Sequence, residues 1–187
     1  GRKHVRAKLV EIIGNEEFPD NERLLWRQSF TRLYEELKIL EERISFQDKE
    51  LLALSAKIEM CKKLMELPGV GAITSTAMIA AVNSANDFKN GRQFAAWLGL
   101  VPRQESSGGK TVLRGITKRG DKYLRKLLVH GARVELHFAK KRNNLWALKL
   151  KDKKGVNKTA VAMANKTARQ IWYVLAGKVP KQKAATV

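Results

Sequence analysis

The chain of 187 residues carries 37 Lys and Arg against 18 Asp and Glu, a formal net charge of +19. Such an excess predicts a polyanionic partner, most often nucleic acid, and the length suffices for a hydrophobic core. A single cysteine, Cys61, excludes an internal disulfide, and no Cys/His cluster has metal-site spacing. No apolar run is long enough to span a membrane and no signal peptide heads the chain, so we expect a cytoplasmic protein without a membrane partner.

The charge is distributed unevenly along the chain. Residues 1–64 carry 13 Lys and Arg against 12 Asp and Glu, whereas residues 65–187 carry the remaining 24 against 6. The sequence therefore predicts a nearly neutral first part and a strongly basic second part with a different task.

A heptad repeat dominates the first part. It follows a short basic segment, Arg2 to Ile13, and a break with Gly14 and Pro19; no Gly or Pro then occurs before Pro68. Apolar residues alternate spacings of four and three, with only Gln47 polar in the series. The stripe consists of Trp26, Phe30, Leu33, Leu37, Leu40, Ile44, Leu51, Leu54, Ile58, Cys61 and Met65. We expect a coiled coil with a helix of a second chain or of a segment outside this one; the alternative is one long helix lying on its own domain's core.

The segment "LPGVGAITSTAMIAA" has the form of a helix-hairpin-helix. A helix ends at Leu67, a Pro-Gly-Val-Gly turn follows, and an Ala-rich helix begins. Backbone N–H groups around Gly69, Val70 and Gly71, with the Thr74 hydroxyl, could hold a phosphate without reading base sequence. The alternative is a tight helical hairpin in which the glycines only make the turn.

The rest of the basic part predicts a mostly α domain around one irregular basic loop. We expect short helices at 92–97 and 144–150, a longer helix from Asp121, a basic link at 149–155 and a last helix over 156–176. On the helix after Asp121, the apolar face comprises Leu124, Leu127, Leu128, Val134 and Leu136. The segment "KTVLRGIT" within the loop could form a short β-hairpin, and residues 178–187 look like a frayed tail.

The basic loop, "GLVPRQESSGGKTVLRGITKRGD", carries the candidate chemistry. Its phosphate-binding candidates are Arg103, Lys110, Arg114, Lys118 and Arg119. These cations could also stabilise charge on a phosphate attacked by a serine. No base adjoins Ser106 or Ser107 in sequence, so the residues alone favour turn formation or phosphate binding for both serines.

The run from "LPGVGAITST" to "HFAKKRNN", with its "AWLGLVPRQ–SSGG–ITKRGD–YLR–LL–HGA" spacing, resembles the C-terminal domain of the Piv-like DEDD transposases. These are encoded by insertion sequences of the 110 and 1111 groups and include bridge-RNA-guided recombinases. The resemblance covers residues 64–177. It implies a coiled-coil arm over 1–65 that pairs protomers into a dimer or tetramer, and a transposase domain over 66–187.

The resemblance also implies the chemistry. One serine of this domain is the expected nucleophile at DNA phosphorus; we assign it to Ser107, with Ser106 as runner-up. Family members carry a RuvC-like N-terminal domain whose carboxylates hold Mg²⁺, and we expect that domain and its metal to be absent from this chain, which would be inactive alone and needs no cofactor of its own. DNA and a guide RNA are the expected partners, in the nucleoid of a bacterium or archaeon.

Two other classes of protein fit parts of the sequence. A non-catalytic nucleic-acid-binding and dimerisation module would use the same hairpin and loop only to hold DNA. A ribosomal protein or RNA chaperone fits the charge but not the long heptad helix.

Overall fold

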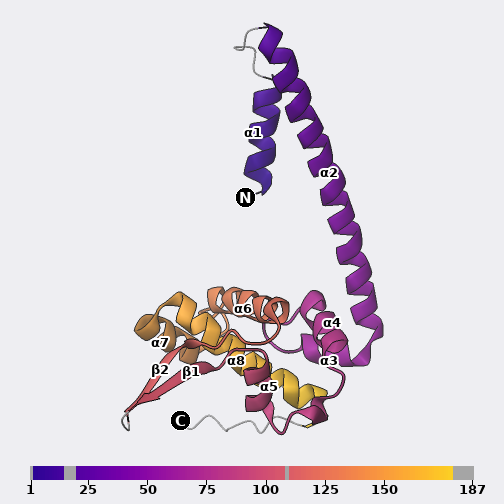
Figure 1. Ribbon diagram of the computed structural model, residues 1–187. Coiled ribbons are helices and arrows are strands. Elements are labelled where there is room, and N and C mark those ends of the chain that lie inside the picture. The colour runs from indigo at the N-terminus through magenta and orange to yellow at the C-terminus, as the bar shows by residue number, and fades with distance from the viewer. Residues whose placement is uncertain (1, 15–19, 108–109, 179–187) are drawn as a thin grey trace. The chain divides into compact units, whose positions relative to one another are not determined.

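The computed structural model describes residues 2–14, 20–107 and 110–178. The fold is 74% helix with one small two-stranded sheet in the described part, which confirms the mostly α prediction (Figure 1). The chain divides into two compact units, Gly1–Glu50 and Leu51–Val187. In chain order the elements are α1 (Arg2–Gly14), α2 (Asp20–Lys57), α3 (Glu59–Met65), α4 (Ala72–Ala81), the 3₁₀ helix η1 (Ala85–Asp87), α5 (Gly91–Trp97), β1 (Pro102–Ser107), β2 (Lys110–Ile116), α6 (Lys122–His137), α7 (Leu145–Lys154) and α8 (Val156–Leu175).

The first unit is a pair of helices. The short basic segment at the start of the chain, for which the sequence predicted no element, forms α1 and lies along α2 (Figure 1). Arg6 Nη1 donates a hydrogen bond to Glu41 Oε2 at 3.0 Å. The hydrogen bond with the Tyr34 side chain, followed by the charge of Glu41, raises the pKa of the Arg6 guanidinium. This polar contact joins residues 35 positions apart, which a pattern within either helix does not reveal.

The apolar stripe of α2 remains largely uncovered in the single chain. Trp26 is 56% exposed, Leu33 53%, Leu40 46% and Ile44 42%. Exposed apolar side chains repeated along one helix favour a further helical partner. The pairing with α1 therefore leaves much of the heptad stripe free for another contact.

The long helix ends earlier than the heptad pattern predicts. The chain leaves the helical conformation at Ile58 (φ −93°, ψ 112°) and resumes as α3. Cys61 and Leu64 of α3 are fully buried, and Leu64 belongs to the core of the second unit. Of the last heptad positions, Cys61 is thus buried within the second unit and does not continue the exposed stripe of α2.

The second unit packs its helices around α8. The core holds Phe94 and Leu98 with Leu124 and Leu128 of α6 and Ile171 of α8. The prediction of a last helix over 156–176 is confirmed by α8, whose buried residues include Ala164, Ala168, Ile171 and Trp172. The Trp172 indole also donates to the Ala85 carbonyl at 3.0 Å, tying η1 to α8.

Two local predictions are wrong. Val134 is 55% exposed, because the buried line of α6 runs through Leu128, Ala132 and Glu135 on its other side. Residues 149–154 are not a link but the second half of α7, which begins at its cap Asn144 and ends only at Gly155. The described helices include none that is long and apolar enough to cross a membrane.

Candidate nucleic-acid interface

The basic loop is a β-hairpin arm, as the sequence analysis allowed. Strands β1 and β2 pair antiparallel, with Gln104 opposite Leu113 and Glu105 opposite Val112, and the register shifts between Pro102 and Gln104. Val112 is 47% exposed and Leu113 65%. A two-stranded ribbon with so much exposed surface is marginally stable in water by itself. Its shape and composition suit a structure that a partner covers.

The two serines occupy the last two positions of β1. In the backbone register Ser106 faces Thr111 and Ser107 faces Lys110. Gly108 and Gly109 lie outside the described residues, as do the side chains of Ser106, Ser107 and Lys110. The structure therefore places the backbone of both serine candidates at the end of the arm that lies away from the helical core.

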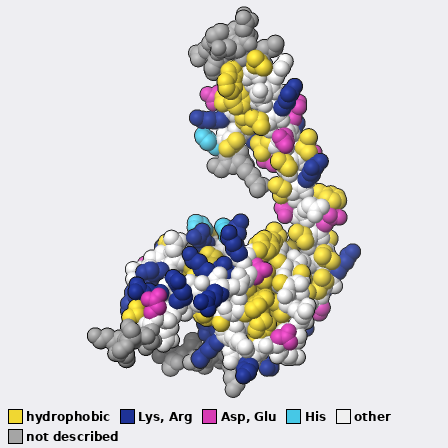
Figure 2. Space-filling model, viewed as in Figure 1, with side chains coloured by type: hydrophobic (Ala, Val, Ile, Leu, Met, Phe, Trp, Pro, Cys, Tyr) yellow, Lys and Arg dark blue, Asp and Glu magenta, His cyan; other side chains and the backbone are white. Residues whose placement is uncertain are grey.

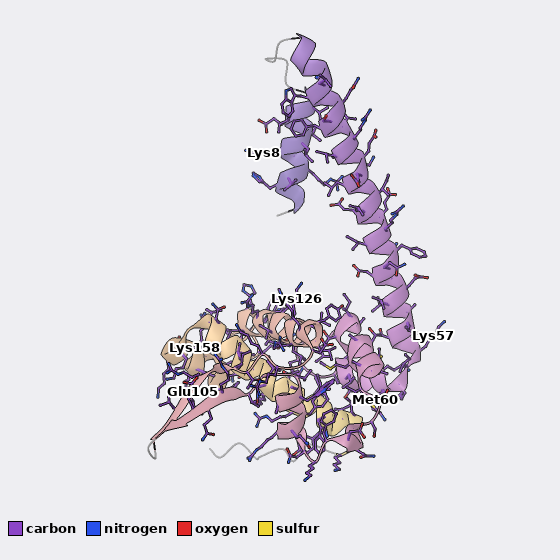
Figure 3. All side chains as sticks on the ribbon, viewed as in Figure 1. Lys8, Lys57, Met60, Glu105, Lys126 and Lys158 are labelled. Atoms are coloured by element: carbon purple, nitrogen blue, oxygen red, sulfur yellow. The ribbon has the colours of Figure 1, made fainter. Side chains whose placement is uncertain are left out.

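The other predicted cations of the loop lie on the arm or just after it. Arg103, Lys118 and Arg119 are exposed. Arg114 Nε donates to Glu105 Oε2 at 2.9 Å, and the two side chains are 60% and 57% exposed (Glu105 is labelled in Figure 3). An ion pair this exposed contributes about 0–1 kcal/mol. Phosphate can therefore compete with Glu105 for the guanidinium.

The base of the arm is held by close backbone contacts that the sequence did not reveal. Lys118 N donates to Gly99 O at 3.1 Å and Thr117 N to Val101 O at 2.9 Å. Gly120, at φ +102°, presses on the Trp97 carbonyl so closely that no Cβ would fit. These contacts hold the segment before β1 against the segment after β2.

Side chains reinforce that base. Arg125 Nη1 of α6 donates to the Leu98 carbonyl at 3.1 Å, and Asn165 Nδ2 of α8 donates to the Leu100 carbonyl at 3.1 Å. Asp121 caps α6 by accepting from Leu124 N at 2.7 Å, as its sequence position predicts. The helical core therefore fixes where the arm begins, whatever the arm binds.

The turn between α3 and α4 is packed against α6 over most of its length. Gly69 has φ +79°, and a Cβ there would lie 2.8 Å from the Gly131 carbonyl oxygen. Val70 and Thr74 are each only 6% exposed. Gly71, the N-cap of α4, has open space where a Cβ would be. Of the four residues predicted to bind phosphate here, Gly71 is the one that the structure leaves open at the surface.

Basic side chains outside the predicted site enlarge the positive surface. Figure 2 shows Lys and Arg gathered over the side of the second unit that carries β1, β2, α6 and α7. Lys126 of α6 and Lys158 of α8 are both exposed (Figure 3). The other exposed Lys and Arg residues on α6, α7 and α8 are Lys122, Arg133, Lys149, Lys151, Lys153, Lys154 and Lys166. The excess of Lys and Arg over residues 65–187 indicates these cations, whereas the sequence motifs point only to the loop.

No metal centre occurs in the part of the chain that the structure describes, where no three His, Cys, Asp or Glu side chains come together. His130 and His137, the histidines of α6, are exposed on that helix. Among the described residues, the loop thus brings cations together without a group of three such potential metal ligands.

Comparison with known proteins places this arrangement in a family. Residues 61–147 match the IS116/IS110/IS902 transposase family, and this span runs from within α3 to the start of α7 and contains the whole hairpin arm. Over residues 61–147 the chain is therefore similar to the transposases of that family. The resemblance expected from the sequence is thereby confirmed.

Individual relatives extend the likeness into the helical arm. The chain is 39% identical to the transposase for insertion sequence element IS1111A of Coxiella burnetii over 178 residues, 94% of this chain and 48% of that protein. It is 40% identical to the transposase for IS1328 of Yersinia enterocolitica over 147 residues, 77% of this chain and 44% of that protein. The chain thus spans about half the length of the curated relatives that it matches.

Proposed function

We propose that this chain is the coiled-coil and serine-bearing part of an insertion-sequence transposase, which binds, cleaves and rejoins DNA. The observation that carries the proposal is the hairpin arm within the family-matched span, with serines at the end of β1 and exposed cations beside them. Its fixed base and exposed strands suit an arm that reaches a DNA phosphate.

The proposed reaction is attack on phosphorus by the Ser107 hydroxyl. A bond forms between Oγ and phosphorus as the serine hydroxyl loses its proton, the bond from phosphorus to the leaving strand breaks, and that strand's oxygen takes up a proton in exchange. The phosphoserine link preserves the energy of the broken phosphodiester bond. The hydroxyl of a second strand can therefore attack the same phosphorus, release the serine and rejoin the DNA. Ser106 is the second candidate for the nucleophile.

The cations of the arm would bind the substrate and stabilise the reaction. Arg103, Arg114, Lys118 and Arg119, with Lys110, are proposed to contact phosphate oxygens on which charge develops. Arg offers paired N–H donors that match two oxygens of one phosphate. The turn before α4 would add backbone N–H groups at Gly71, while Gly69, Val70 and Thr74 hold that turn against the core.

The remaining components would come from outside these residues. Mg²⁺ held by a RuvC-like domain elsewhere in the whole protein would supply Lewis-acid chemistry, since the described residues do not fit a metal site. A second copy would cover the exposed stripe of α2, giving a dimer or tetramer. A guide RNA is the proposed source of target choice, and the nucleoid the proposed place of action.

Paired serine variants of the whole transposase test the proposal. Ser107→Ala should abolish strand exchange while leaving DNA binding nearly intact, because it removes the nucleophile but no charge. Loss of one exposed hydrogen bond would cost only about 1 kcal/mol, several-fold in affinity. Ser106→Ala is the matched control and should remain active. If both variants exchange strands at the rate of the wild type, neither serine is the nucleophile. The arm then only holds DNA, and the alternative function as a non-catalytic nucleic-acid-binding module is correct.

A further inference from the structure

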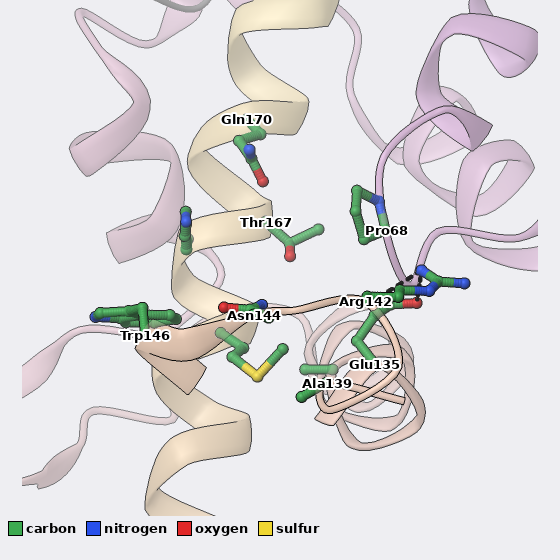
Figure 4. Close-up of a pocket in the computed structure, with 11 residues that line it drawn as sticks. Pro68, Glu135, Ala139, Arg142, Asn144, Trp146, Thr167 and Gln170 are labelled. Carbon is green, nitrogen blue, oxygen red and sulfur yellow. Dashed lines mark hydrogen bonds and ion pairs between the residues drawn. The ribbon is translucent and has the colours of Figure 1, made fainter. Parts of the chain in front are cut away.

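A cavity in the second unit has no part in the proposed strand exchange. It has a volume of about 310 Å³ and lies among α6, α7, α8 and the turn before α4 (Figure 4). Its lining includes Pro68 from the turn, Arg142, Trp146 of α7, and Lys166, Thr167 and Gln170 of α8. That volume is at the lower end of cavities that hold small organic ligands.

One wall of the cavity is an exposed aromatic ring. Trp146 is 44% exposed, although a large apolar side chain in a stable helix is more often covered. Asn144 accepts a hydrogen bond from Ala147 N at 3.1 Å and so fixes the first turn of α7, which carries the indole. The Lys166 ammonium lies 5.0 Å from the ring centroid. The ammonium lies over the indole ring, and an indole plane with a flexible cation over it suits a flat ring carried by an anion.

Polar groups above the ring could recognise the edge of such a ligand. Thr167 and Gln170 are half-buried, and in the described part of the chain their side chains have no hydrogen-bond partner. Both groups are therefore available to hydrogen-bond a ligand that enters the cavity. The Gln170 amide offers both donors and an acceptor, which is the combination that a nucleobase edge presents.

The charges of the cavity favour an anionic ligand. Arg142 Nη1 contacts Glu135 Oε1 at 2.6 Å and Oε2 at 2.7 Å. The Glu135 side chain is 10% exposed and that of Arg142 54%. The charges of Arg142 and Glu135 cancel, while the other guanidinium donors of Arg142 stay at the surface. Lys166, the remaining charged residue of the lining, therefore gives the cavity a net positive charge.

We propose that this cavity receives one unpaired base of a nucleic-acid strand, stacked on Trp146 with its edge at Thr167 and Gln170. The proposal rests on the proposed function, since the strand would be the one that the basic surface binds. Continuity supports a strand over a free nucleotide: Pro68 lines the cavity and immediately precedes Gly69, whose turn is the proposed backbone contact. Single-stranded DNA and RNA share this chemistry.

The test measures binding of single-stranded DNA and RNA that carry 2-aminopurine, whose fluorescence is quenched by stacking. In the whole chain, Trp146→Leu should weaken the affinity for single strands about 5- to 150-fold. It should also remove the quenching for DNA, for RNA or for both. Affinity for a plain duplex should stay within about twofold, because a duplex offers no unpaired base. Trp146→Phe should retain most of the binding, since it keeps an aromatic plane.

Phe46→Leu is the matched control, because Phe46 is an exposed aromatic residue of the other unit and lies outside the heptad stripe. The inference is overturned if Trp146→Leu binds single strands like the wild type, or loses duplex binding equally. It is also overturned if adenosine monophosphate alone binds as tightly as the strands do and depends equally on Trp146, because the cavity then serves a free nucleotide. A wild-type chain that binds neither strand nor duplex would instead refute the proposed function itself.

Discussion

Salt dependence of DNA affinity tests the role of the arm in detail. Each duplex phosphate neutralised by Lys or Arg adds about 0.9 to the fall of log K per decade of salt. Replacing Arg114, Lys118 and Arg119 together by Gln should therefore lower the slope by roughly 2.7 if each contacts one phosphate. The Glu105 contact of Arg114 does not weaken this expectation, because both side chains are more than half exposed.

The assay is fluorescence anisotropy of a labelled duplex, titrated at several salt concentrations. A matched variant replaces three exposed cations of the first unit, Lys8, Arg32 and Lys49, and so changes the net charge by the same amount. Its slope should stay close to that of the wild type. Equal slopes for wild type and arm variant would refute the reasoning and mean that the arm faces away from the DNA.

Three further outcomes follow from the fold. Leu33→Glu with Leu40→Glu should shift the chain toward monomer in analytical ultracentrifugation, since both side chains are exposed on α2; a wild-type chain that is monomeric throughout the micromolar range contradicts this. Asp121→Ala should cost about 1 kcal/mol in urea unfolding through loss of the cap to Leu124 N, and no change would mean that the cap contributes nothing. Gly120→Ala should lower the free energy of unfolding by about 1–3 kcal/mol or more, because alanine is strained in the left-handed backbone conformation of this position. A thermal midpoint like that of the wild type would refute the close contact with Trp97.

Local signals explain which parts of the fold could be predicted. Asp121 and Asn144 cap the helices that follow them, and each accepts a hydrogen bond from the backbone of its first turn. The hairpin followed from a β-prone segment next to a pair of glycines. Such features depend on neighbours within a few residues, so one sequence is enough to indicate them.

Contacts between distant segments explain what the sequence could not predict. The pairing of Arg6 with Glu41 makes α1 part of a helix pair, and the break in the helix at Ile58 leaves the heptad position Cys61 buried in α3. The cavity at Trp146 combines residues from the turn at Pro68 to Gln170. The sequence predicted which residues the arm contains. It did not predict the contacts that hold the base of the arm, such as the hydrogen bond from Arg125 to the Leu98 carbonyl.

The adduct between protein and DNA tests the central claim most directly. The whole transposase would be incubated with a substrate whose leaving strand diffuses away after cleavage, which traps any covalent link. Trypsin cuts after Arg103 and Lys110, so one peptide, residues 104–110, carries both serines. The account predicts that fragmentation mass spectrometry finds the nucleotide on Ser107. A nucleotide on Ser106 would move the nucleophile by one residue, and cleaved DNA without any serine adduct would contradict the account.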